Sequence, residues 1–120
     1  MPFTLPTLNY SYDALSPHFD AKTMEIHHSK HHAGYTNNLN AAIIGTEFEN
    51  KNIVEILTSP NLPIGIRNNG GGYYNHCLFW DILSPSQQDA STDFINLINA
   101  NFKSWDSMKE EFSKLSLIHI

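Results

Sequence analysis

The sequence is poor in three features, and each shortage excludes a class of protein. Its single cysteine, Cys77, excludes a disulfide within the chain, and we interpret it as a small, buried, reduced side chain. No apolar run approaches the roughly 20 residues of a membrane-spanning helix, and the prolines of the first ten residues interrupt any targeting segment. Basic residues are also few: seven Lys and Arg stand against twelve Asp and Glu, a net charge of −5. We therefore expect a cytoplasmic protein with no nucleic-acid partner and no membrane span.

The chain does contain enough hydrophobic residues to form the core of a single domain. Of its 120 residues 41% are hydrophobic, including seven Phe, five Tyr and two Trp. After an extended, proline-containing arm, the pattern predicts helices from about Asp20 to Gly45, over Asn52–Thr58, over Ser91–Asn101 and from Ser104 onward. Asp20 is the predicted N-cap of the first helix and Gly45 its stop. The last two helices are amphipathic and need a partner surface.

The stretch from Ile64 to Leu83 is ambiguous on pattern alone. Gly70, Gly71 and Gly72 each disfavour a helix by about 1 kcal/mol relative to Ala, which suggests a loop followed by an aromatic strand over 73–80. However, the apolar residues from Tyr73 to Leu83 recur at helical spacing, and Ser84-Pro85 then ends the run. We favour a helix.

Histidine is the residue in excess, because four of the seven lie within His27 to His32. On an α-helix, steps of four residues drift by only about 40°, so His27, His31 and Tyr35 share one face and could line one pocket. The same spacing links His28 and His32 one position further round, so this second pair should face elsewhere.

Paired imidazoles suit a transition metal, although hydrogen-bonded core or surface histidines are the more common explanation of such a cluster. The sequence has no H-E-x-x-H zinc motif, and the glycines match neither a Walker phosphate loop nor a dinucleotide fingerprint. The residue types alone leave both alternatives open.

Longer motifs resemble a known family. The segment MEIHHSKHHAGYTNNLNAA (24–42) closely resembles the first long helix of iron/manganese superoxide dismutases, and NNGGGYYNHCLFWDILSP (68–85) resembles the second. The opening FTLPTLNYSYDALSPHFD is similar to the amino-terminal arm of that family, and residues 95–114 resemble the first helices of its carboxy-terminal α/β domain. The resemblance implies a mainly α fold: two long antiparallel helices in residues 1–86, then the beginning of an incomplete second domain in 87–114.

The resemblance also implies roles for individual residues. His27 and His76 would be metal ligands, one from each long helix. His31 and Tyr35 would be the catalytic gateway pair, beside the channel for superoxide and in the hydrogen-bond network of the metal-bound solvent. Trp80 would belong to the aromatic wall, although a core role explains it equally well. His28 and His32 match family positions that are not ligands.

Gly72 bears on the metal, because it lies four residues before His76. Iron-type members commonly carry glutamine there, whereas manganese-type members carry glycine and supply the glutamine from the other domain. The resemblance therefore implies manganese or iron, with manganese or metal tolerance favoured by Gly72. It further implies a homodimer for the full-length enzyme.

The sequence departs from the family in two places. Asn9 replaces a usual proline, which should matter little. After Lys114 the family continues to an aspartate and a further histidine that complete its ligand set, whereas residues 115–120, LSLIHI, are what a transposase end sequence encodes. We expect a truncated reading frame with an artefactual tail. The expected activity is disproportionation of superoxide by the complete enzyme; the alternative is an inactive fragment or non-catalytic helical hairpin with weak or no metal binding.

Overall fold

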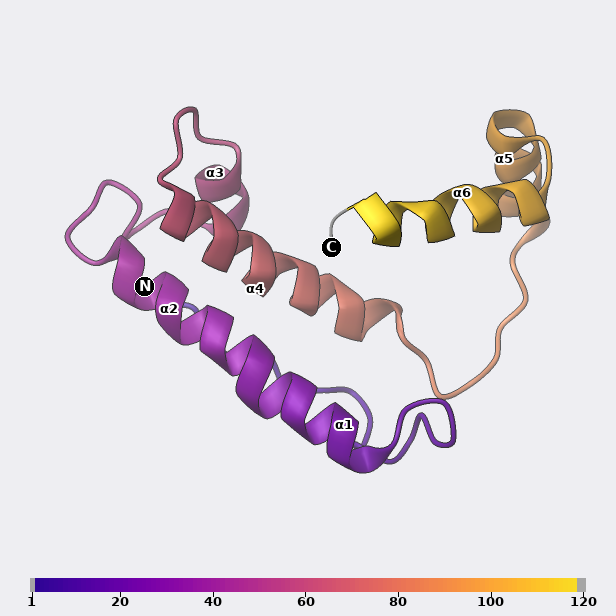
Figure 1. Ribbon diagram of the computed structural model, residues 1–120, viewed down its shortest axis with the longest axis horizontal. Helices are drawn as coiled ribbons and strands as arrows, with labels where there is room; N and C mark the ends of the chain where they lie inside the picture. Colours follow the sequence, from indigo (N-terminus) through magenta and orange to yellow (C-terminus); the bar gives the residue numbers. More distant parts are fainter. Residues whose placement is uncertain (1, 119–120) are drawn as a thin grey trace. The chain divides into compact units, whose positions relative to one another are not determined.

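The computed structural model describes residues 2–118, and these are mainly helical, with no strand among them (Figure 1). Tertiary contacts divide the chain into one unit that ends at Pro85 and a second that begins at Ser86. The helical segments are α1 (Ala21–Ile26), η1 (His27–His32), α2 (Ala33–Ile43), α3 (Ile53–Leu57), α4 (Ile64–Ile82), α5 (Thr92–Phe102) and α6 (Trp105–Ile118). The fold class predicted from the sequence is confirmed for the helical hairpin.

The first long helix is continuous through α1, η1 and α2, and it begins and ends where the sequence predicts. The Asp20 carboxylate caps the amino end by accepting a hydrogen bond of 2.8 Å from the backbone N–H of Thr23. At the other end Gly45 has φ of +69°, a left-handed conformation that glycine adopts without steric cost. The chain leaves the helix at Ile44, whose ψ is 130°, directly before Gly45.

The middle of this helix differs from the prediction, because η1 is π-helical rather than α-helical. The backbone N–H of Ala33 donates to the carbonyl of His28, five residues earlier, where an α-helix would use the residue four earlier. The wider turn reduces the angle around the helix axis between residues five apart, such as His27 and His32, relative to an α-helix.

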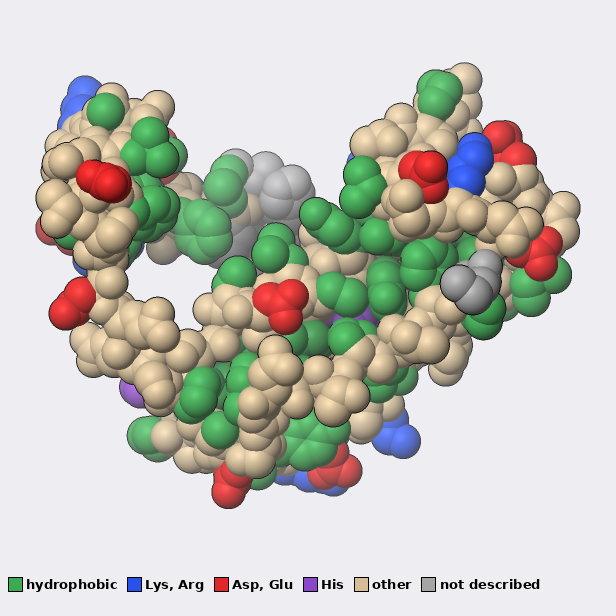
Figure 2. All heavy atoms as spheres, turned by 180° about the vertical axis from the view of Figure 1, so that it is seen from behind, with side chains coloured by type: hydrophobic (Ala, Val, Ile, Leu, Met, Phe, Trp, Pro, Cys, Tyr) green, Lys and Arg blue, Asp and Glu red, His purple; other side chains and the backbone are tan. Residues whose placement is uncertain are grey.

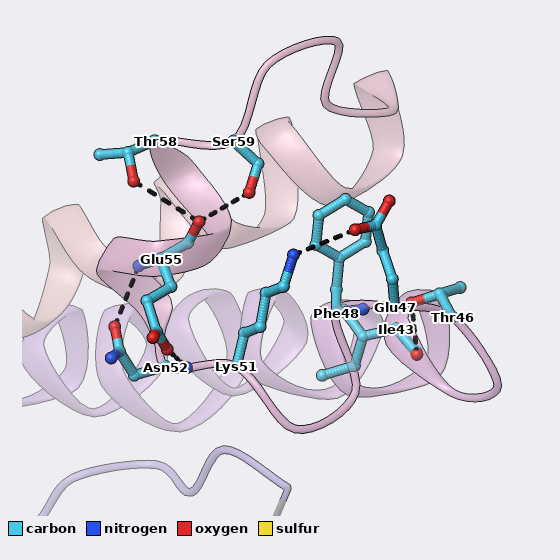
Figure 3. Close-up of polar contacts among 9 residues, drawn as sticks. All are labelled: Ile43, Thr46, Glu47, Phe48, Lys51, Asn52, Glu55, Thr58 and Ser59. Carbon is cyan, nitrogen blue, oxygen red and sulfur yellow. Dashed lines mark hydrogen bonds and ion pairs between the residues drawn. The ribbon is translucent and has the colours of Figure 1, made fainter.

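A compact polar link joins α2 to α3 (Figure 3). The Asn52 side chain accepts from the backbone N–H of Glu55, and the Glu55 carboxylate accepts from the backbone N–H of Asn52, which together form a capping box. Lys51 pairs with Glu47 at 3.1 Å and lies over the Phe48 ring. This link holds α3 against the ends of the long helices.

The helix α4 runs antiparallel to α2 and packs along it, so the three glycines lie inside a helix and not in a loop (Figure 1). Gly70 explains why a small residue is needed, since a Cβ there would lie 3.2 Å from the Leu57 side chain. Two apolar clusters fill the hairpin. One comprises Leu39, Ile43, Phe48, Ile56 and Ile66, and the other comprises Leu15, Met24 and Trp80.

The second unit contains α5 and α6. Side chains of Ser91 and Ser104 accept from backbone N–H groups at the start of each helix, as the predicted boundaries require. The Phe94 and Trp105 rings meet at 6.0 Å. The α6 backbone continues through Ile118, so part of the expected tail is helical, and residues 119–120 of it lie outside the described residues.

Apolar side chains also lie on the surface of both units (Figure 2). On α4 the exposed set Tyr74, Leu78 and Ile82 follows one face at steps of four residues. In the part of the chain that the structure describes, no helix combines the length and apolarity that crossing a membrane requires.

Candidate metal centre

The two histidines predicted as metal ligands face each other across the hairpin. His27 comes from the beginning of η1 and His76 from the middle of α4, and their Nε2 atoms lie 2.9 Å apart. The ring planes are nearly perpendicular, at 88°, with centroids 4.9 Å apart. Residues 49 positions apart in the sequence are thus brought together by the antiparallel packing of the helices.

The tautomer of His76 is fixed by its other ring nitrogen. Nδ1 lies 2.7 Å from the carbonyl oxygen of Gly72, and because a carbonyl only accepts, Nδ1 carries the proton and donates it. Nε2 of the neutral ring therefore carries an electron pair, which accepts the hydrogen bond of 2.9 Å from the Nε2–H of His27. This is how metal-binding histidines are commonly oriented in proteins.

A pocket of about 400 Å³ opens beside this pair, and it is lined by Thr23, Ile26, His27, His31, Tyr35 and His76. The prediction that His31 and Tyr35 line the same cavity as His27 is confirmed. The His31 ring lies 6.2 Å from that of His27, and the Tyr35 ring lies 5.2 Å from that of His76. Thr23 was not predicted, although it stands four residues before His27 and the helical spacing could have revealed it.

The second histidine pair is buried beside this pocket, but its two members behave differently. His28 makes structural hydrogen bonds, with the Tyr12 hydroxyl at 3.0 Å and with the carbonyl of Pro6 at 2.8 Å. His32 instead lies with its ring stacked on His76, centroids 5.3 Å apart and planes 24° apart. Neither residue lines the pocket, so the expectation that this pair lies off the axis of the cavity is confirmed, although His32 is in ring contact with His76.

Burial favours the neutral form of two of the histidines, His27 and His32. The pKa of His27 is lowered mainly by burial and further by the nearby His76 and His31. The pKa of His32 falls to about 4, mainly through burial, then through His76 and His28, with a smaller opposing effect from a backbone hydrogen bond at Tyr73. Neutral imidazole is the form that binds a metal ion.

Gly72 lies against the Tyr35 ring. A Cβ at position 72 would come within 2.6 Å of Cγ and 2.7 Å of Cε1 of Tyr35, far inside ordinary contact distance. Glycine is thus required here by close approach, and any larger residue must displace the ring. At position 71 nothing lies within 4 Å of such a Cβ.

Trp80 is 4% exposed, and it contacts His27 without itself lining the pocket. Its ring centroid lies 4.8 Å from that of His27, and its indole N–H donates to Nδ1 of His32 at 3.0 Å. Phe79, which the sequence did not single out, also lies near His27, at 5.4 Å. Trp80 belongs at once to the apolar core and to the surroundings of the histidine pair.

The donor set fits a transition metal as part of a coordination sphere. Two imidazole nitrogens each about 2.1 Å from one ion would be about 3 Å apart at an angle near 90°, close to the separation in the structure. No group of three or more His, Cys, Asp or Glu side chains suited to a metal occurs among residues 2–118. The remaining ligands would have to come from solvent or from other protein segments.

A helical hairpin with one histidine from each long helix at a shared pocket is the architecture of a metal-binding helical domain. The sequence model for the alpha-hairpin domain of iron/manganese superoxide dismutases matches residues 2–84. The protein named superoxide dismutase (Fe) from Raoultella planticola is 49% identical over an alignment that covers 95% of this chain and 71% of that protein. The chain belongs to the iron/manganese superoxide dismutase family.

Proposed function

We propose that this chain supplies the amino-terminal metal ligands, His27 and His76, of a superoxide dismutase. The observation that carries the proposal is the approach of the two Nε2 atoms to 2.9 Å at the edge of a pocket. The similarity to superoxide dismutase (Fe) supplies the reaction class. In that reaction two superoxide anions and two protons become one dioxygen and one hydrogen peroxide.

A bound manganese or iron ion would supply the one-electron redox chemistry, and the protein would hold the site and manage access and protons. His76 is prepared for its part by the Gly72 carbonyl, which fixes the proton on Nδ1 and leaves Nε2 to bind. His27 is kept neutral by burial, which lowers its pKa. His31 and Tyr35 stand at the pocket wall, where an imidazole and a phenol can exchange protons with a small anion that enters.

For the metal we propose manganese, or tolerance of both manganese and iron. The support is Gly72, which lies against the Tyr35 ring, so a glutamine side chain at this position would have to displace that ring. A glutamine that hydrogen-bonds metal-bound solvent would have to come from another segment. The relative is named an iron enzyme, so the metal content of this protein after expression with equal manganese and iron tests the proposal.

Two further proposals follow from family membership and composition. We propose a homodimer for the full-length enzyme, to be tested by light scattering of the purified protein. We also propose a cytoplasmic location, because the one thiol, Cys77, is free and half-buried and needs no oxidising compartment. Cell fractionation followed by detection of the protein tests this location.

A second candidate is a non-catalytic hairpin that binds metal weakly or not at all. It is favoured because no group of three or more His, Cys, Asp or Glu side chains among residues 2–118 is placed to hold a metal ion together. Two neutral imidazoles leave most of the coordination sphere to water and offer no carboxylate to balance the charge of a trivalent ion.

One experiment separates the two candidates. The 120-residue chain and a version extended by a family carboxy-terminal domain are both loaded with manganese or iron and assayed for superoxide removal per bound metal. We expect turnover in the extended version and little in the chain alone, with both losing metal on His76→Ala. Metal binding that survives His76→Ala would contradict the ligand assignment. Turnover absent from the extended version would favour the non-catalytic hairpin.

A further inference from the structure

We propose that His32 is a positioning residue that holds both members of the His27–His76 pair in place. This inference rests on the proposed function, since it concerns the pair assigned there to metal binding. It assigns His32 no ligand role: it acts through its neighbours.

The first support is that both ring nitrogens of His32 have partners, which fixes the tautomer and the orientation of the ring. The side chain is completely buried, at 0% exposure. Its Nδ1 accepts from the Trp80 indole N–H, and because that indole can only donate, Nδ1 must be unprotonated. The ring proton therefore sits on Nε2, which points to the Cys77 sulfur 3.8 Å away. His32 is locked in one tautomer and one orientation.

The second support is that His32 reaches His27 through Trp80. The indole packs edge-on against the His27 ring, with centroids 4.8 Å apart. Packing in the apolar core already restricts the indole, and its N–H bond to His32 adds a directional contact that fixes the ring edge beside His27.

The third support is the direct contact with the other ligand. The His32 ring lies nearly parallel to the His76 ring, 24° between planes, and so limits its tilt. The Gly72 carbonyl fixes the same ring at its Nδ1 edge. Together an edge and a face of His76 are held, which leaves Nε2 aimed at His27.

The π-helical turn contains both His27 and His32. It reduces the angle around the helix axis between these two residues relative to an α-helix, and the same turn presents a proposed ligand and the residue that supports it. π-helical turns are frequent at functional sites. His28, by contrast, is engaged with Tyr12 and Pro6 and has no ring contact with His76 among the described contacts.

Three substitutions separate the two contacts of His32. His32→Asn keeps a hydrogen-bond acceptor near the position of Nδ1 but loses the ring. His32→Phe keeps a flat ring against His76 but loses the acceptor for Trp80. His32→Leu loses both. The matched control is Thr36→Val, because Thr36 is 3% exposed on the same helix and its hydroxyl donates to the backbone carbonyl of His32 and not to a ring.

The first measurement needs no metal. Ring ¹⁵N shifts report the tautomers of His27 and His76, and hydrogen exchange reports protection of the Trp80 indole N–H. We expect a single Nδ1–H tautomer for His76 and a protected indole in the unsubstituted 120-residue chain and in Thr36→Val. His32→Asn should disturb His76 alone, His32→Phe should expose the indole, and His32→Leu should do both.

The second measurement is manganese(II) affinity, from the free ion detected by electron paramagnetic resonance. Loss of a residue that orients metal-binding histidines weakens binding by about 10- to 100-fold, so we expect a loss of this size for His32→Leu and almost none for Thr36→Val. Unchanged His27 and His76 shifts in a folded His32→Leu would overturn the inference. If that variant does not fold, unchanged shifts and indole exchange in His32→Asn and His32→Phe would overturn it.

The two proposals fail differently. If His76→Ala binds manganese(II) as tightly as the unsubstituted chain does, the proposed metal site is contradicted. The ring ¹⁵N shifts would still decide whether His32 positions the pair. Conversely, metal binding that requires His76 but ignores every His32 variant, with unchanged ring shifts, would leave the proposed function standing and refute the role of His32.

Discussion

Adding one methyl group at Gly71 should stabilise the fold, whereas adding it at Gly72 should not. Both glycines lie within α4, so replacement by Ala removes the same helix-propensity penalty of about 1 kcal/mol in each case. The surroundings differ. At position 71 a Cβ meets nothing within 4 Å, whereas at position 72 it comes within 2.6 Å of the Tyr35 Cγ atom.

The magnitude follows from these two terms. Gly71→Ala should stabilise the fold by about 1 kcal/mol, because nothing opposes the gain in helix propensity. Forcing an extra carbon into a filled place costs about 1 to 3 kcal/mol, so Gly72→Ala should be neutral or destabilising by up to about 2 kcal/mol. The two variants should therefore differ by about 1 to 3 kcal/mol in free energy of unfolding.

Urea unfolding monitored by circular dichroism measures this difference directly. The unsubstituted chain serves as the reference, and the Tyr35 ring resonances show whether the ring has moved in Gly72→Ala. Equal stabilisation by the two substitutions, with unchanged Tyr35 resonances, would refute the close approach of Gly72 and Tyr35. It would also remove the structural support for manganese at this position.

Three further outcomes are expected. In the metal-free chain, the free energy of unfolding should be highest above the ordinary histidine pKa of 6.5 and should fall by on the order of 3 kcal/mol as the pH drops toward the His32 pKa of about 4. The reason is that the unfolded chain takes up the proton at a higher pH than the folded chain does. Thermal melts between pH 7 and 4 measure this fall, and a His32→Phe variant with the same pH dependence would contradict it. Asp20→Ala should lower the free energy of unfolding by about 1 kcal/mol through loss of the helix cap, and an unchanged urea midpoint would refute that role. Tyr35→Phe should leave metal content unchanged while altering the pH profile of superoxide removal in the extended enzyme, and loss of metal would instead make Tyr35 a structural support.

The limits of the helices were predictable because local chemistry fixes them. Asp20 offers a carboxylate to the first free N–H groups, and Gly45 supplies the left-handed conformation that ends the helix. Residue spacing alone could not predict that His27 and His76 face each other. Spacing put His27, His31 and Tyr35 on one face, but only the resemblance to a family joined them to His76 on another helix.

Packing between helices was not predictable from either helix alone. The three glycines argue against a helix by propensity, and tertiary contacts override that preference because small residues let α4 approach its neighbours closely. Gly70 meets Leu57 and Gly72 meets Tyr35, contacts that exist only once the hairpin has formed. The sequence indicates that small residues are needed in this helix. It does not indicate which side chain packs against each glycine.

The role of His32 shows why a single assumption about helix geometry matters. At α-helical spacing, His27 and His32 point in different directions, and His32 falls into a second pair with no part in the site. A π-helical turn has no reliable mark in the sequence, since it inserts its extra residue where side-chain packing repays the poorer hydrogen bonding. Here that packing is a buried hydrogen bond to Trp80 and a ring stacked on His76. The helix distortion thus lies in the same segment as the residue that contacts both Trp80 and His76.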